Sequence, residues 1–287
     1  MEPRRILGGV RLALSVLFLW LVLGGNWVNL RTESFGVFHE LGGAGFGIVA
    51  VILGAAMVLV SLVDLRGDGN VRLGPLGVGA GQLLLALAFG SFTTLLGFVI
   101  VVHSGAFRSL GDIKGAGWGA AGACLTAYIL PQAAIMGIGF LGTASSTRLP
   151  DQERRSLATG LLIAGAAVAL SPTLEWFSTE ERSWSGYDPG APRMGFILLV
   201  LGGVLALAGG MRLRTGGLAE PGGRLAHPHL QLMAGLAVIG PVAGWLLTGM
   251  RRDDFSVGIG PWVALAAGVV TVTLAVVECT RREVTAG

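Results

Sequence analysis

The sequence predicts an all-α integral membrane protein: eight transmembrane helices as two parallel four-helix repeats, with both termini in the cytoplasm. Three observations carry this prediction. The 287 residues are 53% hydrophobic and only 13% charged, whereas a soluble domain carries about 25% charged residues. Eight apolar stretches follow one another along the chain, most of them near the roughly 20 residues that a spanning helix needs. Several distinctive residues recur at a nearly constant spacing.

The eight expected spans alternate with polar or glycine-rich loops. They are Ile6–Gly25, Gly42–Val63, Leu76–Val102, Gly115–Leu141, Leu157–Leu174, Met194–Met211, Leu230–Met250 and Phe255–Val277. The fifth and sixth are the shortest, so their ends are the least defined. The first has a basic start like a signal peptide, but no small-residue cleavage site follows it, so we interpret it as a retained helix.

The small residues indicate close helix packing. Glycine accounts for 48 residues, far above the usual ~7%. In a bilayer, small residues let helix backbones approach one another closely. Cys124 lies within an apolar stretch and Cys279 at the end of one, and neither has metal-ligand spacing. We therefore expect no disulfide, metal or cofactor.

The basic residues indicate the orientation. With the N-terminus inside, thirteen of the 20 Lys and Arg residues lie on the cytoplasmic side and seven on the other. Cytoplasmic loops are enriched in these residues, so both termini are expected inside. Because the arginines cluster at helix ends, the positive net charge does not indicate nucleic-acid binding. The composition points to a bacterial inner (cytoplasmic) membrane protein.

Matching residues in the two halves of the chain predict an internal repeat. The pairs are Trp27/Trp176 and Gln82/Gln231 at a spacing of 149, Gly45-Phe46/Gly195-Phe196 at 150, and Trp118/Trp262 at 144. Four spans per half is an even number, so both halves begin on the same side and the repeats are parallel. The expected parts are a first repeat over 1–144, a cytoplasmic linker over 145–156 and a second repeat over 157–287.

The segment Phe255–Trp262, reading Phe-Ser-Val-Gly-Ile-Gly-Pro-Trp, carries a resemblance. With the Trp in the first outer loop, it resembles uncharacterised Trp- and Gly-rich four-helix membrane proteins of GC-rich bacteria, here in tandem duplicate. The resemblance covers both halves and implies no known activity, so no functional residue is transferred from it.

Three glutamines are the polar candidates inside the bilayer. Gln82 and Gln231 occupy matching positions near the inner ends of the third and seventh spans, and Gln132 lies beside Pro131. An amide in lipid must find a hydrogen-bonding partner, so each is expected to face another helix. They either form structural bonds between helices or line a pathway at the interface of the two repeats.

Ionisable side chains within the spans are few. Asp64 and Glu278 lie at inner ends beside Arg66 and Arg281, which favours an interpretation as interface anchors. In the outer loops, His39, Glu40, His103 and Asp112 have no diagnostic metal spacing and are interpreted as solvated loop residues.

The outer loop over 175–193 interleaves aromatic and charged residues, as protein-binding surfaces do. Its candidates for partner docking, with the matching residue of the first loop, are Trp27, Trp176, Trp184, Tyr187, Glu180, Glu181 and Asp188. No catalytic constellation is evident. The sequence therefore favours a non-enzymatic subunit or scaffold of a membrane complex. Its expected partners are the lipid bilayer and either another membrane protein or a second copy of the chain. The alternative is a small carrier or channel for a neutral or apolar solute, with an enzyme acting on lipids third.

Overall fold

In the computed structural model, the described residues are 3–30, 33–39, 44–66, 78–104, 113–138, 149–188, 193–215, 227–251 and 256–284. They form eight α-helices and six short strands. The helices are α1 (Pro3–Gly24), α2 (Ala44–Arg66), α3 (Ala80–Ser104), α4 (Trp118–Ile138), α5 (Asp151–Leu170), α6 (Gly195–Thr215), α7 (His227–Gly249) and α8 (Ile259–Val284). A short 3-10 helix, η4 (Ser171–Thr173), follows α5.

The helices confirm the coarse prediction of a helical protein suited to a membrane. Seven of them are long and apolar enough to cross a bilayer, by length and composition: α1, α2, α3, α5, α6, α7 and α8. Among the described residues, α4 is not one of the seven.

Helix α5 begins at Asp151, inside the predicted linker over 145–156. Pro150 has an extended backbone, with φ −51° and ψ 144°, and directly precedes the helix. Asp151 and Glu153 lie in the first turn, where the positive end of the helix dipole favours carboxylates. Two acidic residues that resemble a polar linker therefore start a helix. Residues 145–148 lie outside the described part of the chain.

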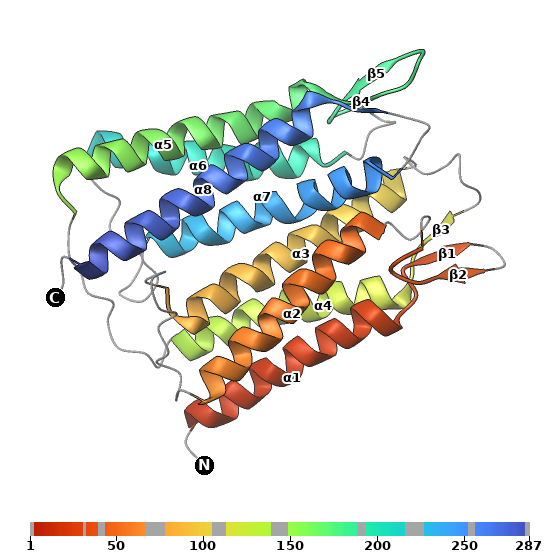
Figure 1. Cartoon of the computed structure of the whole chain (residues 1–287), viewed down its shortest axis with the longest axis horizontal. Helices are drawn as coiled ribbons and strands as arrows, with labels where there is room; N and C mark the ends of the chain where they lie inside the picture. The colour runs from red at the N-terminus through yellow and green to blue at the C-terminus, as the bar shows by residue number, and fades with distance from the viewer. Residues whose placement is uncertain are drawn as a thin grey trace.

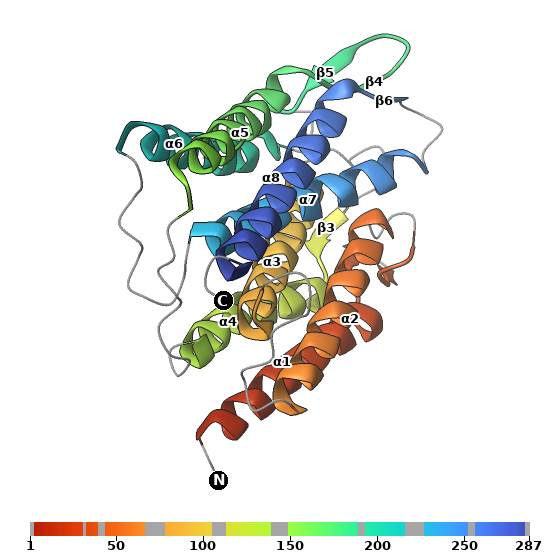
Figure 2. The same ribbon diagram turned by 60° about the vertical axis from the view of Figure 1, so that its left-hand side comes forward.

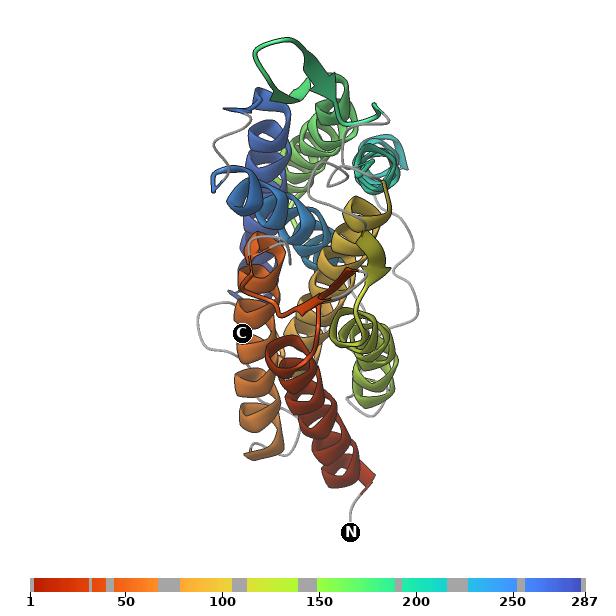
Figure 3. The ribbon, with the colours of Figure 1, turned by 90° about the vertical axis from the view of Figure 1, so that its right-hand side faces the viewer.

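The helices lie side by side, as Figure 1 shows, with the strands at one end of the bundle and both chain termini at the other. We call these the sheet end and the terminal end. Helices α3 and α7 pack against each other in the middle. Seen from the sheet end, the bundle is elongated, with α1, α2 and α4 on one side of this central pair and α5, α6 and α8 on the other (Figure 3).

Two three-stranded antiparallel sheets, which the sequence did not predict, cap the sheet end. The strands are β1 (Val28–Leu30), β2 (Ser34–Phe35), β3 (Ile113–Ala116), β4 (Glu175–Ser178), β5 (Ser183–Ser185) and β6 (Ser256–Val257). The sheets have the orders β2-β1-β3 and β5-β4-β6. In each, the central strand follows α1 or α5, and the third strand directly precedes α4 or α8.

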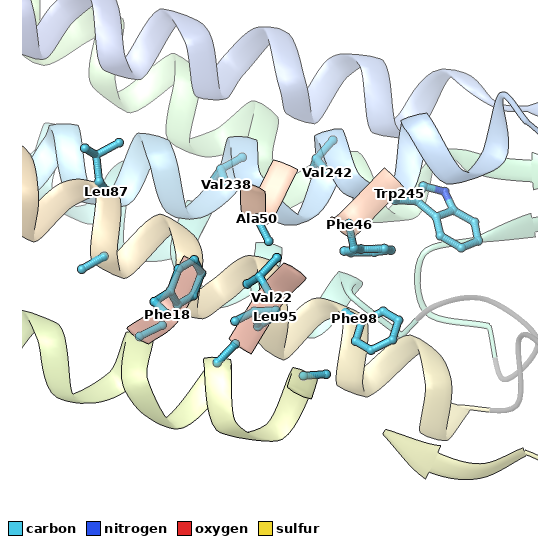
Figure 4. Close-up of a cluster of buried hydrophobic side chains, with 14 of the residues drawn as sticks. Phe18, Val22, Phe46, Ala50, Leu87, Leu95, Phe98, Val238, Val242 and Trp245 are labelled. Atoms are coloured by element: carbon cyan, nitrogen blue, oxygen red, sulfur yellow. The ribbon is translucent and has the colours of Figure 1, made fainter. Parts of the chain in front are cut away.

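The core lies along the central helices. Figure 4 shows Phe46 of α2 beside Trp245 of α7, with Phe98 of α3 nearby. The Phe46 and Phe98 ring centroids are 5.9 Å apart. The shared core residues of α2, α3 and α7 join the two halves of the chain into one hydrophobic cluster.

Glycines set the closest approaches between the halves. A Cβ added to Gly240 of α7 would lie 2.9 Å from the carbonyl oxygen of Gly90 of α3. One added to Gly45 of α2 would meet the backbone of Gly244 and Thr248 of α7. Backbones can pack this closely only where no side chain intervenes. The seam between the halves is therefore filled by close helix packing.

Candidate functional site: the two sheet caps and two buried ion pairs

A buried tryptophan anchors each sheet to the helix before it. The Trp27 indole N–H donates to the Val22 carbonyl at 3.0 Å, and the Trp176 indole N–H donates to the Ser171 carbonyl at 3.0 Å. Both indoles are completely buried. Each therefore binds a backbone carbonyl at the end of the preceding helical segment, where such carbonyls are open to partners outside the helix. The burial removes Trp27 and Trp176 from the predicted docking surface, because a partner cannot reach either ring.

The backbone carbonyl of each tryptophan also accepts a hydrogen bond from a glycine just before a later helix. The Gly117 N–H donates to the Trp27 carbonyl at 2.7 Å, and the Gly258 N–H donates to the Trp176 carbonyl at 3.0 Å. A Cβ on either glycine would collide with the backbone of the residue before the tryptophan. The geometric equivalents before α4 and α8 are thus these glycines, 141 residues apart. They are not Trp118 and Trp262, which the sequence pairs at 144.

The β4–β5 hairpin carries an aromatic stack. The Phe177 and Trp184 rings are parallel to within 10°, with centroids 4.6 Å apart. The Arg182 guanidinium lies 5.7 Å from the centre of the Trp184 ring. Phe177 also meets Trp245 of α7 edge-on, at 6.0 Å. The stack fixes the hairpin on the bundle and leaves Trp184 half-buried at the sheet end.

The other docking candidates lie at the tip and base of this hairpin. Glu180 and Glu181 are exposed in a turn that a hydrogen bond from the Thr179 N–H to the Arg182 carbonyl closes, at 2.8 Å. At the base, Asp188 accepts the Ser185 N–H at 2.7 Å. Tyr187 packs edge-on against Phe196 of α6, at 5.5 Å. The hairpin thus gathers Trp184, Tyr187, Glu180, Glu181 and Asp188 in one region.

The three glutamines make different contacts. Gln82 is the third residue of α3, and its side-chain oxygen accepts the Gly79 N–H at 2.8 Å, as in a capping box. Gln231 is buried and donates to Glu278 at 3.5 Å. Gln132 is exposed on α4. The two matching positions therefore have different roles, a helix cap for Gln82 and a buried polar contact for Gln231, and the amide of Gln132 is exposed.

Two buried ion pairs are the polar features that sequence reasoning missed. Arg11 of α1 pairs with Asp64 of α2 at 2.7 Å, and Arg212 of α6 binds Glu278 of α8 with two bonds of 2.8 and 3.0 Å. The interpretation of Asp64 and Glu278 as interface anchors is wrong, because both carboxylates are shielded within the bundle. A charge buried among apolar helices requires such a partner.

Within the described residues, no group of three His, Cys, Asp or Glu side chains could hold a metal ion. His39 stacks on Phe35, with centroids 4.1 Å apart, and the His103 Nδ1 lies 2.8 Å from the Val99 carbonyl oxygen. Glu40 and Asp112, considered with them in the sequence, lie outside the described residues. No family model, curated protein or solved structure matches this chain.

Proposed function

We propose that the chain is a multipass protein of a bacterial cytoplasmic membrane and a non-enzymatic subunit or scaffold of a membrane complex. In this proposal all eight helices span, as two parallel four-helix repeats. Both termini are cytoplasmic, and the sheet end faces outward. The similar strand orders of the two sheets and the matching Trp27 and Trp176 bonds support the repeat.

The neighbours of α4 support its assignment as a spanning helix. Its side chains Leu125, Tyr128 and Ile135 are exposed, as lipid-facing side chains would be. Helices α1 and α3, both apolar enough to span, pack on its other face. A helix held between two spanning helices and carrying an apolar outer face fits the bilayer. With α4 included, both termini lie on the same side of the membrane.

The docking role is supported by the packing of the β4–β5 hairpin. The Phe177–Trp184 stack holds the hairpin on the bundle, while Glu180 and Glu181 remain exposed at its tip. A rigid aromatic base with a charged rim resembles a binding surface, where most of the binding free energy comes from a few aromatic side chains. Because the surface is held in place before binding, little conformational entropy is lost on association.

The carrier alternative gains no support from the described residues. The amide of Gln82 caps its own helix, and that of Gln231 is bound to Glu278. The backbones of α3 and α7 approach closely at Gly90 and Gly240, which leaves little space between these two helices at that level.

Site-directed photocrosslinking in native membranes tests the docking role. A photoreactive residue replaces Glu181 at the tip, and in a matched control variant it replaces Ser34, an exposed residue of the other sheet. We expect one defined crosslinked species at 181, none at 34, and loss of that species when Trp184→Ala is added. Docking at this hairpin is excluded if position 181 gives no species, or if the pattern at position 34 is the same.

A further inference from the structure

Helices α5 and α6 form one tightly joined unit. A Cβ on Gly209 of α6 would lie 2.6 Å from the backbone nitrogen of Leu162 of α5. Gly202 makes the same kind of contact with the Ala169 backbone, and Gly165 of α5 meets the backbone of α6. Backbones in contact at three levels leave little freedom for one helix to move without the other. We call this pair the α5–α6 hairpin.

The α5–α6 hairpin is attached to the rest of the bundle mainly through α8. Helix α6 packs along α5 and touches α7 only briefly, whereas α5 also packs on α8. Figure 2 shows α5 and α6 together on the far side of α8 from α1 and α2. At the sheet end, β4 pairs with β6 through Phe177 and Val257, and β6 leads directly into α8.

At the terminal end, two ion pairs join the same elements. Arg212 of α6 binds Glu278 of α8, with side chains that are 3% and 0% exposed. One turn later on α8, Arg281 binds Glu153 of α5 at 2.7 Å, in a pair that is about half exposed. Helix α8 supplies the acid of one pair and the base of the other, and the α5–α6 hairpin supplies the oppositely charged partner in each. The α6–α8 link depends on these long side chains, since the two helices do not pack along each other.

We propose that Glu278 and Arg281 form a clasp that holds the terminal end of the α5–α6 hairpin, and that opening the clasp lets the hairpin pivot about the β4–β6 pairing. An unpaired charge buried among apolar helices is strongly unfavourable. Loss of the Glu278 charge therefore drives Arg212 toward water and carries the end of α6 with it.

Pulsed electron–electron distance measurements test the clasp in the full chain in lipid nanodiscs. Spin labels are placed at Arg214→Cys on α6 and Ile135→Cys on α4, both exposed positions near the terminal end. Cys124→Ala and Cys279→Ala remove the native thiols. We expect one narrow distance in this background. In Glu278→Gln, a second distance should appear beside the first or replace it. The two distances should differ by on the order of 5 Å, the scale of a one-turn helix displacement.

The charge swap Arg212→Glu with Glu278→Arg should restore the narrow distance. If Glu278→Gln acted only by destabilising the protein, the swap would not restore it. Asp64→Asn, which breaks the buried pair between α1 and α2, is the matched control and should leave the 135–214 distance unchanged. The clasp is refuted if monodisperse Glu278→Gln protein keeps the original distance, or if Asp64→Asn moves it equally.

The half-exposed ion pair between Arg281 and Glu153 provides a second test if Glu278→Gln does not fold. Arg281→Glu removes the half-exposed bond to Glu153 and places two acids opposite each other. It should broaden the same distance, and adding Glu153→Arg should narrow it again. An unchanged distance in folded Arg281→Glu protein, or no recovery on the swap, contradicts the proposal.

Discussion

Trp27 and Trp176 make the same hydrogen bond in the two halves of the chain, each donating its indole N–H to a carbonyl five residues earlier at 3.0 Å. Each also accepts a glycine N–H from the residue that leads into a later helix. One residue thus joins a helix end, a central strand and the start of another helix. The buried tryptophan is the point around which each sheet cap is built.

Substitution of either tryptophan should destabilise the protein to a similar extent. Trp27→Phe and Trp176→Phe each remove the indole donor and leave a small void, which predicts a loss of about 2 kcal/mol in the free energy of unfolding. Thermal unfolding in detergent micelles measures the effect. Trp118→Phe, at a half-exposed position, is the control and should change the free energy by much less. A large effect at only one of the two buried sites would show that the caps are not equivalent.

The glycine contact between the halves should be intolerant of larger side chains. Gly240→Val places two methyl groups against the backbone of Gly90 and the side chain of Thr94. We expect about 3 kcal/mol of destabilisation, seen as a lower midpoint of thermal unfolding. Gly203→Val is the matched control, because a Cβ there meets nothing within 4 Å. If both variants have the same midpoint of thermal unfolding, the two halves are not in close contact at α3 and α7.

The two glutamines should respond differently to the same substitutions. Gln82→Glu keeps an acceptor for the Gly79 N–H and should leave stability unchanged or slightly raised, whereas Gln82→Leu should cost about 1 kcal/mol. Gln231→Glu places a second carboxylate beside Glu278 and should be strongly destabilising. The readout is the unfolding midpoint of the four single variants, with Gln231→Leu completing the set. Parallel behaviour of the two positions would instead favour a shared role at the interface of the halves.

The Arg11–Asp64 pair should be replaceable only as a unit. Arg11→Leu or Asp64→Leu alone leaves a buried charge without its partner, for a predicted loss of about 3–5 kcal/mol. The double variant Arg11→Leu/Asp64→Leu should recover most of this loss, since apolar side chains suit the apolar surroundings. A double-mutant cycle of unfolding free energies tests the coupling. Additive losses would mean that the two side chains do not depend on each other.

The seven confirmed membrane-length helices were predictable because an apolar run of about 20 residues is a local property. The sheet caps were not, because strands of two to four residues are too short to establish a periodic pattern. Residue spacing correctly singled out Trp27 and Trp176 as a pair. It also placed both residues on a docking surface, although their rings are buried. Residue spacing does not show burial, because burial depends on which chain segments cover a ring.

The candidate polar residues show the same division. Asp64 and Glu278 have arginines two or three residues away in the sequence, yet bind Arg11 and Arg212 on other helices. The arginine nearest in the sequence is not the partner of either carboxylate, because the packing of the helices decides which side chain of another helix faces it. For the same reason Gln82 and Gln231, matched in position, meet a backbone N–H in one case and a carboxylate in the other.

The sequence by itself determined that this protein is built from apolar helices of membrane length, because hydrophobicity along a run of residues is additive and needs no partner. The tertiary structure decided which helices meet, that two tryptophans close the sheet caps, and that the buried charges pair between helices. Those features depend on contacts between distant segments, whose geometry arises only when the helices pack.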